Sequence, residues 1–449
     1  MLDLTQKANK RLGCHSTRRK MIINTCFALI LIVVMLTSLL NYSQPSFARP
    51  KVPAGGPLLN NPGLKAELVV SGLKAPTSLS YLGPNEILVT EKNTGIVQMV
   101  QNGVISKEPL IRLNVSKDDE RGLLGIALSA DKRTIFLYYT ELRPNEGEIT
   151  NNVYRYDLVS NKLINPKLLL SIPGLPGPQH NGGKIMIGKD NNLYITIGDV
   201  GGSFVGNSTE TKTQNYANGS EPDGRAGIIR ITQEGKPVGN GILGGSQILN
   251  LYYAYGIKNI FGIDFDPVTG NLWDTENGPT FGDEINLVEP GFNSGWAKIQ
   301  GIWLVQTQEG GKTEPTKGKL APEMPQDLVN FGDKGKYSTP EFTWDHSVAP
   351  TALLFVNSSK MGKQYENEML VGDAKYGNIY HFKLNQNRTG LMLNGTLTDK
   401  VADKVEEMGS NILGSGFGVV TDLQMGPDGN VYVLVFDKED GRLYRITPS

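Results

Sequence analysis

One pattern recurs along the chain and restricts its fold more than any other feature. The pattern is a turn rich in Gly, Pro, Asn or Asp, a run with apolar residues at every second position, a second turn and a second such run. Six copies begin at Pro84, Asp131, Lys189, Thr269, Tyr365 and Gly426. A period of two is typical of β-strands, and turns such as Asp-Gly and Asn-Thr-Gly suit hairpins between them. The sequence therefore predicts an all-β fold, a six-bladed β-propeller built from six antiparallel units.

The first 48 residues differ from everything after them. A basic stretch at 10–20 precedes an almost uncharged apolar run at 21–40, and the small-residue motif Ser46-Phe47-Ala48 follows. This order predicts export, through either a cleaved signal peptide or a retained membrane anchor, because about 20 apolar residues suffice to span a bilayer. We expect a signal or anchor at 1–48, a linker at 49–63 and the propeller at 64–449, in an extracellular or periplasmic location.

The charge balance argues against a nucleic-acid partner. The 449 residues include 44 Lys and Arg and 45 Asp and Glu. Six of the basic residues and one acidic residue lie in the first 48, so the remainder carries a net charge of −6. Such a domain lacks the basic excess of nucleic-acid binding proteins. The chain also contains no GxSxG, HExxH or phosphate-binding motif, so hydrolase and nucleotide chemistry gain no support from motifs.

A histidine lies inside the glycine-rich turn GPQHNGGK at 177–184, which leads directly into the strand-like run KIMIGKDNNLYITIGD. The residues alone leave two interpretations open. His180 is either a polar residue in a solvated turn or a base held at the mouth of a site. The repeat architecture by itself also permits a recognition scaffold without catalysis.

Several strings in this order resemble one protein family. They are ERGLLGIAL, PQHNGGK, LYITIGD, YAYGIKNIFGIDFDP, TENGPTFGDEINLVEPGFNSGW and VTDLQMGPDG. Over residues 64–447 the chain resembles the soluble glucose and aldose sugar dehydrogenases that depend on pyrroloquinoline quinone (PQQ), the glucose/sorbosone dehydrogenase family. The resemblance implies a six-bladed propeller with PQQ and calcium. It also implies oxidation of the C1 position of an aldose to the lactone, with electrons passing to an external acceptor.

The resemblance also assigns roles to residues of this chain. His180 is expected to be the general base and Asp199 the residue that orients it. The expected calcium ligands are the carbonyls of Gly278 and Pro279 at the cofactor and, at a second site, Glu284 and Ser294. The expected contacts to the cofactor are Lys375, Lys258, Asn259, Asn277 and Thr421. Glu120, Gln179 and Trp344 are expected to face the sugar.

The pattern departs from the family at three arginine positions, which here are Lys258, Val419 and Thr421. A lysine does not reproduce the bidentate fork of an arginine, and the other two residues carry no charge. Two alternatives therefore stay open: a binding propeller without redox chemistry, and a calcium-dependent lactonase.

Overall fold

The computed structural model of the chain describes residues 49–143, 148–201, 210–246, 248–306 and 315–449. Strands dominate these residues, and the prediction of an all-β fold is confirmed. The helices among the described residues are five short 3-10 helices: η1 (Lys212–Gln214), η2 (Leu249–Leu251), η3 (Lys363–Tyr365), η4 (Gly395–Asp399) and η5 (Val405–Asn411). None of the helices in the described ranges has the length and hydrophobicity needed to cross a bilayer. The predicted signal or anchor at 1–48 lies outside the described residues.

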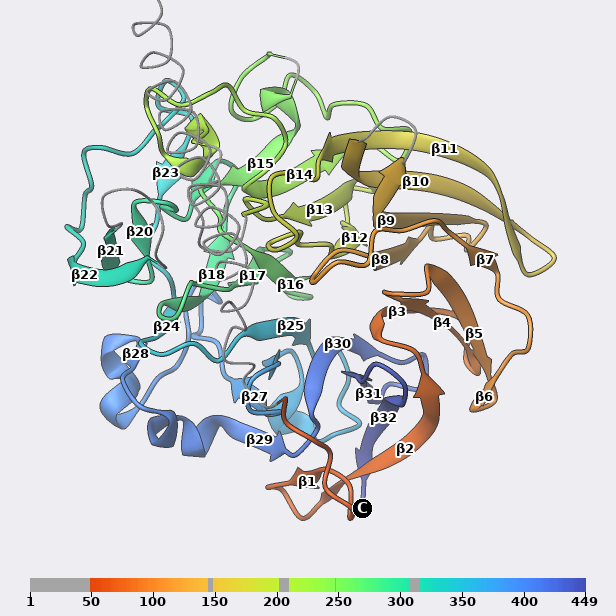
Figure 1. Cartoon of the computed structure of the whole chain (residues 1–449). Helices are drawn as coiled ribbons and strands as arrows, with labels where there is room; N and C mark the ends of the chain where they lie inside the picture. Colours follow the sequence, from red (N-terminus) through yellow and green to blue (C-terminus); the bar gives the residue numbers. More distant parts are fainter. Residues whose placement is uncertain (1–48, 144–147, 202–209, 247, 307–314) are drawn as a thin grey trace, which may run out of the picture. The chain divides into compact units, whose positions relative to one another are not determined.

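Six large sheets make up the domain, and each has one edge strand nearest the centre (Figure 1). The first three sheets contain β3 (Pro76–Gly83), β4 (Glu86–Glu91), β5 (Ile96–Gln101), β6 (Val104–Ile105) and β7 (Ile111–Arg112); β8 (Leu123–Leu128), β9 (Thr134–Arg143), β10 (Glu148–Val159) and β11 (Lys162–Pro173); and β12 (Ile185–Ile187), β13 (Leu193–Ile197), β14 (Gly227–Ile231), β15 (Tyr252–Tyr255), β19 (Phe292–Asn293) and β23 (Lys336–Tyr337).

The other three large sheets follow in chain order. They contain β16 (Ile260–Phe265), β17 (Leu272–Glu276), β18 (Asp283–Val288), β24 (Phe342–Trp344) and β28 (Val401–Ala402); β25 (Pro350–Phe355), β26 (Met369–Asp373), β27 (Ile379–Phe382), β29 (Ile412–Ser415) and β1 (Leu58–Leu59); and β30 (Val419–Met425), β31 (Val431–Phe436), β32 (Gly441–Pro448) and β2 (Leu64–Leu73). A small seventh sheet contains β20 (Ile299–Gln300), β21 (Trp303–Gln306) and β22 (Thr316–Leu320).

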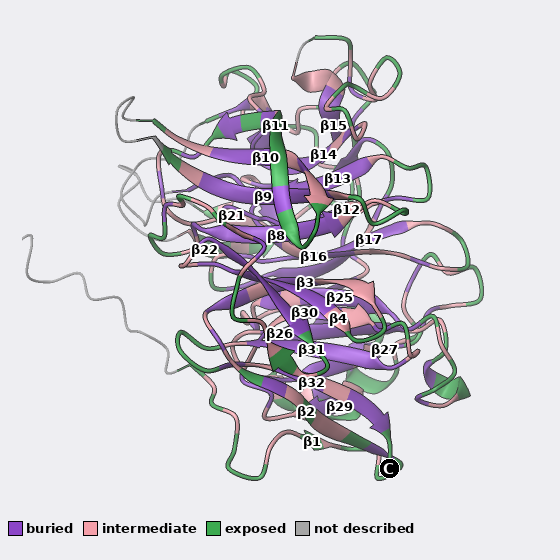
Figure 2. Ribbon diagram, turned by 90° about the vertical axis from the view of Figure 1, so that its right-hand side faces the viewer, coloured by how far each residue is buried: buried purple, intermediate pink, exposed green. Residues whose placement is uncertain are grey.

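Each repeated unit found in the sequence supplies the second and third strands of one large sheet. The unit that starts at Pro84 forms β4 and β5, and the unit that starts at Gly426 forms β31 and β32. These central strands are buried on both faces: all five residues of β13, of β17 and of β26 are buried. Figure 2 shows this burial through the middle of the domain. The alternating sequence suggests one solvated face, but a neighbouring sheet covers each side.

Hydrophobic clusters between neighbouring sheets hold the sheets in a ring. One buried cluster lies between each successive pair of large sheets, and the sixth joins the last sheet to the first through residues such as Leu73, Leu79 and Leu434. The innermost strands of neighbouring sheets also contact one another, and between the third and fourth sheets β13 contacts β16. Burial of apolar surface is the main stabilising contribution to such an arrangement.

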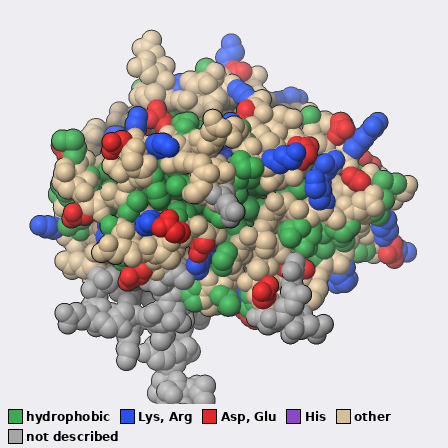
Figure 3. Space-filling view, turned by 90° about the horizontal axis from the view of Figure 1, so that it is seen from above, with side chains coloured by type: hydrophobic (Ala, Val, Ile, Leu, Met, Phe, Trp, Pro, Cys, Tyr) green, Lys and Arg blue, Asp and Glu red, His purple; other side chains and the backbone are tan. Residues whose placement is uncertain are grey.

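The ring is closed by strands that are distant in the sequence. Strand β2 pairs antiparallel with β32, the last strand of the chain, from Leu64 opposite Pro448 to Leu73 opposite Gly441. Strand β1, which lies inside the predicted linker 49–63, pairs with β29. The two N-terminal strands thus complete the last two sheets. On the face seen in Figure 3, the described Lys and Arg side chains are interspersed with Asp and Glu side chains.

Candidate functional site

The turn that presents His180 depends on glycine. His180, Gly182 and Gly183 have φ angles of 59°, 59° and 117°, in the left-handed region that favours glycine and that histidine tolerates better than most residues. A Cβ atom at Gly182 would lie 2.5 Å from the Thr196 carbonyl oxygen, and one at Gly183 would lie 2.5 Å from Leu124 Cβ. The turn therefore packs directly against β13 and β8, so the position of His180 is set by the core of two sheets.

Asn181 holds the same turn in place through buried hydrogen bonds. It is completely buried, its carbonyl accepts a hydrogen bond from the Tyr138 hydroxyl (2.7 Å), and its side-chain oxygen accepts one from the Asn151 amide (3.0 Å). Its own amide group donates to the Pro178 carbonyl (2.6 Å). The sequence-based prediction missed this residue, although it lies inside the HNGG motif. Its role in the turn depends on two partners, Tyr138 of β9 and Asn151 of β10, which are distant from it in the sequence.

His180 and Asp199 form a close pair, as the resemblance implies. The distance from His180 Nδ1 to Asp199 Oδ1 is 2.7 Å, and the backbone N–H of Gly201 donates to the same oxygen (2.9 Å). The Trp296 indole N–H donates to Asp199 Oδ2 (2.8 Å). Burial alone would raise the pKa of Asp199, but interaction with His180, the charge of Lys258 and the Trp296 hydrogen bond together lower it. Asp199 is therefore a carboxylate at neutral pH and orients the imidazole.

The other ring nitrogen of His180 contacts Lys258, with 2.9 Å between Lys258 Nζ and His180 Nε2. An ammonium group can only donate, so Nε2 carries the lone pair and Nδ1 carries the proton that Asp199 accepts. Lys258 is only 6% exposed and also lies over the Trp296 ring, 5.8 Å from its centroid. No carboxylate oxygen in the described part of the chain forms a direct ion pair with this ammonium group, although its charge lowers the pKa of Asp199 and counteracts the raised pKa of Glu276. His180 Nε2 thus lies against a buried ammonium group that makes no direct ion pair among the described residues, although its charge reaches Asp199 and Glu276.

Two further predicted residues support the turn. Glu120 Oε2 accepts hydrogen bonds from the backbone N–H of His180 (2.7 Å) and from Asn259 Nδ2 (3.3 Å). Asn259 Oδ1 accepts one from the backbone N–H of Gly182 (3.1 Å). Gln179 lies beside them and donates to Asp119 Oδ2 (3.0 Å). The structure therefore brings Glu120, Gln179, Asn259 and Lys258 to His180, from the β7–β8, β11–β12 and β15–β16 connections.

A cluster of buried carboxyl groups lies behind Lys258. Glu276 Oε1 accepts a hydrogen bond from the Lys258 backbone N–H (2.7 Å). The Ser294 hydroxyl lies 2.6 Å from Glu276 Oε2 and 2.9 Å from Glu284 Oε2, although it has one hydrogen to donate. Burial raises the pKa of Glu276, Glu284 and the adjacent Asp274, and repulsion from Glu284 raises the pKa of Glu276 further. Sequence-based prediction missed Glu276, which ends a strand in the string LWDTE.

The donor atoms of this cluster suit a hard cation such as calcium. Three oxygens of the network have no hydrogen-bond partner among the described residues: Asp274 Oδ2, Asn286 Oδ1 and Gln300 Oε1. Buried oxygens of this kind are costly unless something binds them. Across the described ranges, however, no three acidic, histidine or cysteine side chains converge closely enough to hold a metal ion. Glu284 and Ser294 are adjacent through their hydrogen bond, and their role as calcium ligands stays a prediction.

Gly278 and Pro279 lie in the connection between β17 and β18. The Gly278 backbone N–H donates to Asp283 Oδ1 (2.8 Å), and the other oxygen of Asp283 accepts the backbone N–H groups of Val348 (2.6 Å) and Ala349 (2.7 Å). Asp283 thereby ties the predicted calcium turn to the loop before β25.

Two predicted cofactor contacts meet this loop and the start of β25. Asn277 Nδ2 donates to the Pro350 carbonyl (2.9 Å), and Lys375 Nζ donates to the Ser347 carbonyl (2.8 Å).

Two predicted residues do not join this network. The Thr421 hydroxyl is directed to backbone carbonyls at the junction of β30 with β3, 3.1 Å from Pro76 O. Trp344 is completely buried in the hydrophobic cluster between the fourth and fifth sheets, where it packs against Phe342 and Phe382. The prediction that Trp344 contacts the sugar is wrong, because its side chain has no exposed surface. The sequence Phe-Thr-Trp is equally compatible with a rim and with a core strand.

Comparison with known proteins identifies the family. Residues 73–445 match the Glucose / Sorbosone dehydrogenase family, and the chain belongs to it. Quinoprotein glucose dehydrogenase B of Acinetobacter calcoaceticus is 26% identical over 435 residues, which cover 84% of this chain and 87% of that protein. Aldose sugar dehydrogenase YliI of Escherichia coli (strain K12) is 26% identical over 394 residues, which cover 86% and 93%. The resemblance inferred from the motifs is therefore confirmed.

A solved structure has the same fold. The PQQ-bound form of the aldose sugar dehydrogenase from Streptomyces coelicolor superimposes with a TM-score of 0.60 at 20% identity, covering 88% of this chain and 100% of that one. At this identity the likeness concerns the fold, and the chemistry of the site has to be argued from the residues of this chain.

Proposed function

We propose that the ring of six sheets is a six-bladed β-propeller that works as a quinoprotein oxidoreductase. It would oxidise the C1 position of an aldose to the lactone, with PQQ as the electron acceptor, calcium at the cofactor, and an external acceptor for the electrons. Membership of the family and the names of the relatives support sugar oxidation with PQQ in general. We further propose that the protein is exported, in line with the leader at 1–48.

One observation carries the assignment: the buried ammonium group of Lys258 touches the candidate base and makes no direct ion pair with a carboxylate of the described residues. Asp199 and Glu276 interact with this charge without a direct ion pair, so a negatively charged ligand in contact with the ammonium group would stabilise it further. PQQ has three carboxylates, and Lys258 with Lys375 would hold it, assisted by Asn259 and Asn277. Such a ligand would compensate the charge of Lys258 in a site that lacks the arginines of the family.

The residues of the chain then have distinct tasks. PQQ would supply, when bound, a two-electron acceptor for the hydride of the sugar C1 carbon. His180 Nε2 would accept the proton of the C1 hydroxyl, which makes loss of hydride from that carbon easier. Asp199 would stabilise the resulting imidazolium and keep its ring oriented. Lys258 must leave Nε2 before that nitrogen accepts a proton, and an anion bound beside Lys258 would draw it away.

The direct test is a titration of PQQ into the purified full-length chain with calcium present, followed by absorbance and by dye reduction with a panel of aldoses. The proposal expects saturable binding and reduction that depends on the sugar. If micromolar PQQ did not bind, the dehydrogenase proposal would be rejected. Hydrolysis of a lactone with calcium alone would indicate the lactonase instead.

Replacing Lys258 with methionine is expected to weaken PQQ binding about tenfold to a hundredfold. A hydrogen bond to a charged group contributes about 1.5–3 kcal/mol, and methionine keeps the length of the side chain without the charge. The dissociation constant measured by absorbance titration checks this. Lys298→Met is a matched control, because Lys298 lies over the Tyr216 ring and not at His180. Equal affinity in the wild type and in K258M would show that Lys258 does not bind the cofactor.

Replacing Asp199 with asparagine is expected to lower kcat at least about tenfold to a hundredfold, the range found when metal-bound histidines lose the partner that orients them. The amide cannot accept at both positions. Its NH2 group would face either the Trp296 N–H or the Gly201 N–H and the His180 ring. Steady-state kinetics with saturating PQQ measures the effect. Asp190→Asn, in the β12–β13 turn, is the control and should keep the kcat of the wild type. An unchanged kcat in D199N would refute the role of Asp199.

A further inference from the structure

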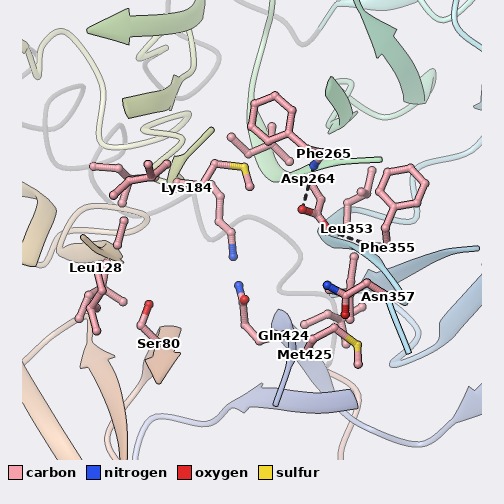
Figure 4. Close-up of a pocket in the computed structure, with 18 of the residues that line it drawn as sticks. Ser80, Leu128, Lys184, Asp264, Phe265, Leu353, Phe355, Asn357, Gln424 and Met425 are labelled. Atoms are coloured by element: carbon pink, nitrogen blue, oxygen red, sulfur yellow. Dashed lines mark hydrogen bonds between the residues drawn. The ribbon is translucent and has the colours of Figure 1, made fainter. Parts of the chain in front are cut away.

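A cavity lies at the other end of the ring from the His180 network. Its volume is about 300 Å³, and all six innermost strands line it. Residues at or near the ends of these strands contribute, among them Leu128 of β8, Ile187 of β12, Phe265 of β16 and Met425 of β30. The close-up in Figure 4 shows the side chains of Leu128, Phe265 and Met425 around a common space.

The cavity is separate from the candidate site. Residues that precede the innermost strands form the network around His180, for example Asn259 directly before β16. Asp264 and Phe265, which line the cavity, are at the far end of the same strand. Five residues of extended strand span about 16 Å, which separates Asp264 from the His180 network, and Lys184, directly before β12, is the lining residue nearest His180 in the chain.

An ion pair enters the cavity from one side. Lys184 Nζ contacts Asp422 Oδ1, and both side chains are largely buried. Asp422 also accepts hydrogen bonds from the Ser78 hydroxyl (3.0 Å), the Leu79 backbone N–H (2.9 Å) and Gln424 Nε2 (3.2 Å). The acceptor positions of Asp422 are therefore occupied. Lys184 keeps two N–H donors that Asp422 does not use, and Figure 4 shows its ammonium group at the centre of the space.

Asp264 lies across the cavity from Lys184 (Figure 4). Each of its oxygens accepts one backbone hydrogen bond, from Phe265 N–H (2.8 Å) and from Phe355 N–H (2.8 Å), so each retains a free acceptor position. Three other polar groups at the wall have no hydrogen bond to any described residue: the Ser80 hydroxyl, the Asn357 amide and the Gln424 side-chain oxygen. The space therefore offers donors and acceptors that the fold itself does not use.

The charges and the open hydrogen-bonding groups together restrict the ligand. Asp264 and Asp422 disfavour an anion, and Lys184 disfavours a cation. An apolar ligand would leave donors and acceptors unpaired, which is costly. A hydroxyl group both donates and accepts, so several hydroxyl groups satisfy such a mixture. We propose that this cavity is a binding site for a neutral polyhydroxylated molecule of the size of a monosaccharide or sugar alcohol, separate from the His180 site and not dependent on PQQ.

The test uses ligand-observed saturation-transfer NMR on the full-length chain without PQQ. The probes are sorbitol and methyl α-D-glucopyranoside, neither of which has a free C1 hydroxyl on a sugar ring. The double variant Ser80→Ala with Asn357→Ala removes two wall groups that make no hydrogen bond within the described chain, so the fold should be unaffected. Gln179→Ala is the matched control at the opposite end of the ring.

We expect millimolar binding in the wild type, binding at least about tenfold weaker in the double variant, and unchanged binding in Gln179→Ala. Absence of saturation transfer from both probes, or equal transfer in the double variant, would overturn the proposal. So would loss of binding in Gln179→Ala, or stronger binding of acetate or methylammonium than of the polyols. None of these outcomes depends on the PQQ titration, so the two proposals fail separately.

Discussion

Replacing His180 with asparagine is expected to lower kcat/KM for aldose oxidation about 10²- to 10⁴-fold, the usual contribution of a positioned general base. The Nε2 lone pair of His180 is the basic group of the network, and Asp199 and Lys258 fix its direction. Asparagine tolerates the left-handed backbone at this position, where φ is 59°, so the turn should survive the substitution. The loss should therefore reflect the missing base and not a displaced loop.

The measurement is dye-coupled steady-state kinetics with saturating PQQ and calcium. Binding of PQQ and the urea midpoint of H180N should stay close to those of the wild type. His381→Asn is the matched control, because His381 is in β27 and packs against Tyr365. Oxidation by H180N at nearly the rate of the wild type would exclude His180 as the base and would reopen the interpretation of a polar turn residue.

Replacing Trp344 with alanine is expected to lower the free energy of unfolding by about 3–5 kcal/mol, the range for an aromatic residue in a close-packed core. Trp344 is completely buried, its ring meets Phe342 edge to face with 4.9 Å between centroids, and Tyr380 lies 5.8 Å away. The substitution would leave a cavity in the hydrophobic cluster between the fourth and fifth sheets. The KM for the sugar should change little, because the side chain does not reach the surface.

Urea denaturation and sugar kinetics on the same preparation distinguish a core residue from a substrate contact. Trp344→Phe should lose much less stability than W344A, because it keeps an aromatic ring and removes an indole N–H that has no partner among the described residues. Met324→Ala is the exposed control, since Met324 is 79% exposed. A raised KM with unchanged stability in W344A would mean that Trp344 contacts the sugar after all.

Local patterns in the sequence predict the central strands well. Alternating apolar residues at positions such as 86–91 and 431–436 form β4 and β31, because the period of two is a property of the extended backbone itself. The same patterns do not reveal that both faces are buried, since that depends on neighbouring sheets. The pairing of β2 with β32 joins residues that are far apart in the sequence, and no local signal encodes it.

In the candidate site, too, some features can be predicted from the sequence and others depend on the tertiary structure. The glycines of the HNGG turn are readable from the sequence, because the backbone at 182 and 183 admits no side chain. The resemblance to the family supplied His180 and Asp199 as a pair. It did not supply Trp296, which is 97 residues from Asp199 in the chain, nor the position of Lys258 on the Nε2 atom of His180. Both contacts arise where separate connections between strands meet at one end of the ring.

The sequence alone thus determined the strand units, the glycine turn that presents a histidine, and the family, because each depends on residues close together or on a motif. The tertiary structure decided which side chains share an environment. It placed Trp344 in the core, buried Lys258 against His180 without a direct ion pair among the described residues, and created a polar cavity from the ends of six strands. The physical reason is that burial, charge pairing and cavity formation depend on packing between sheets, and packing joins residues that the sequence keeps far apart.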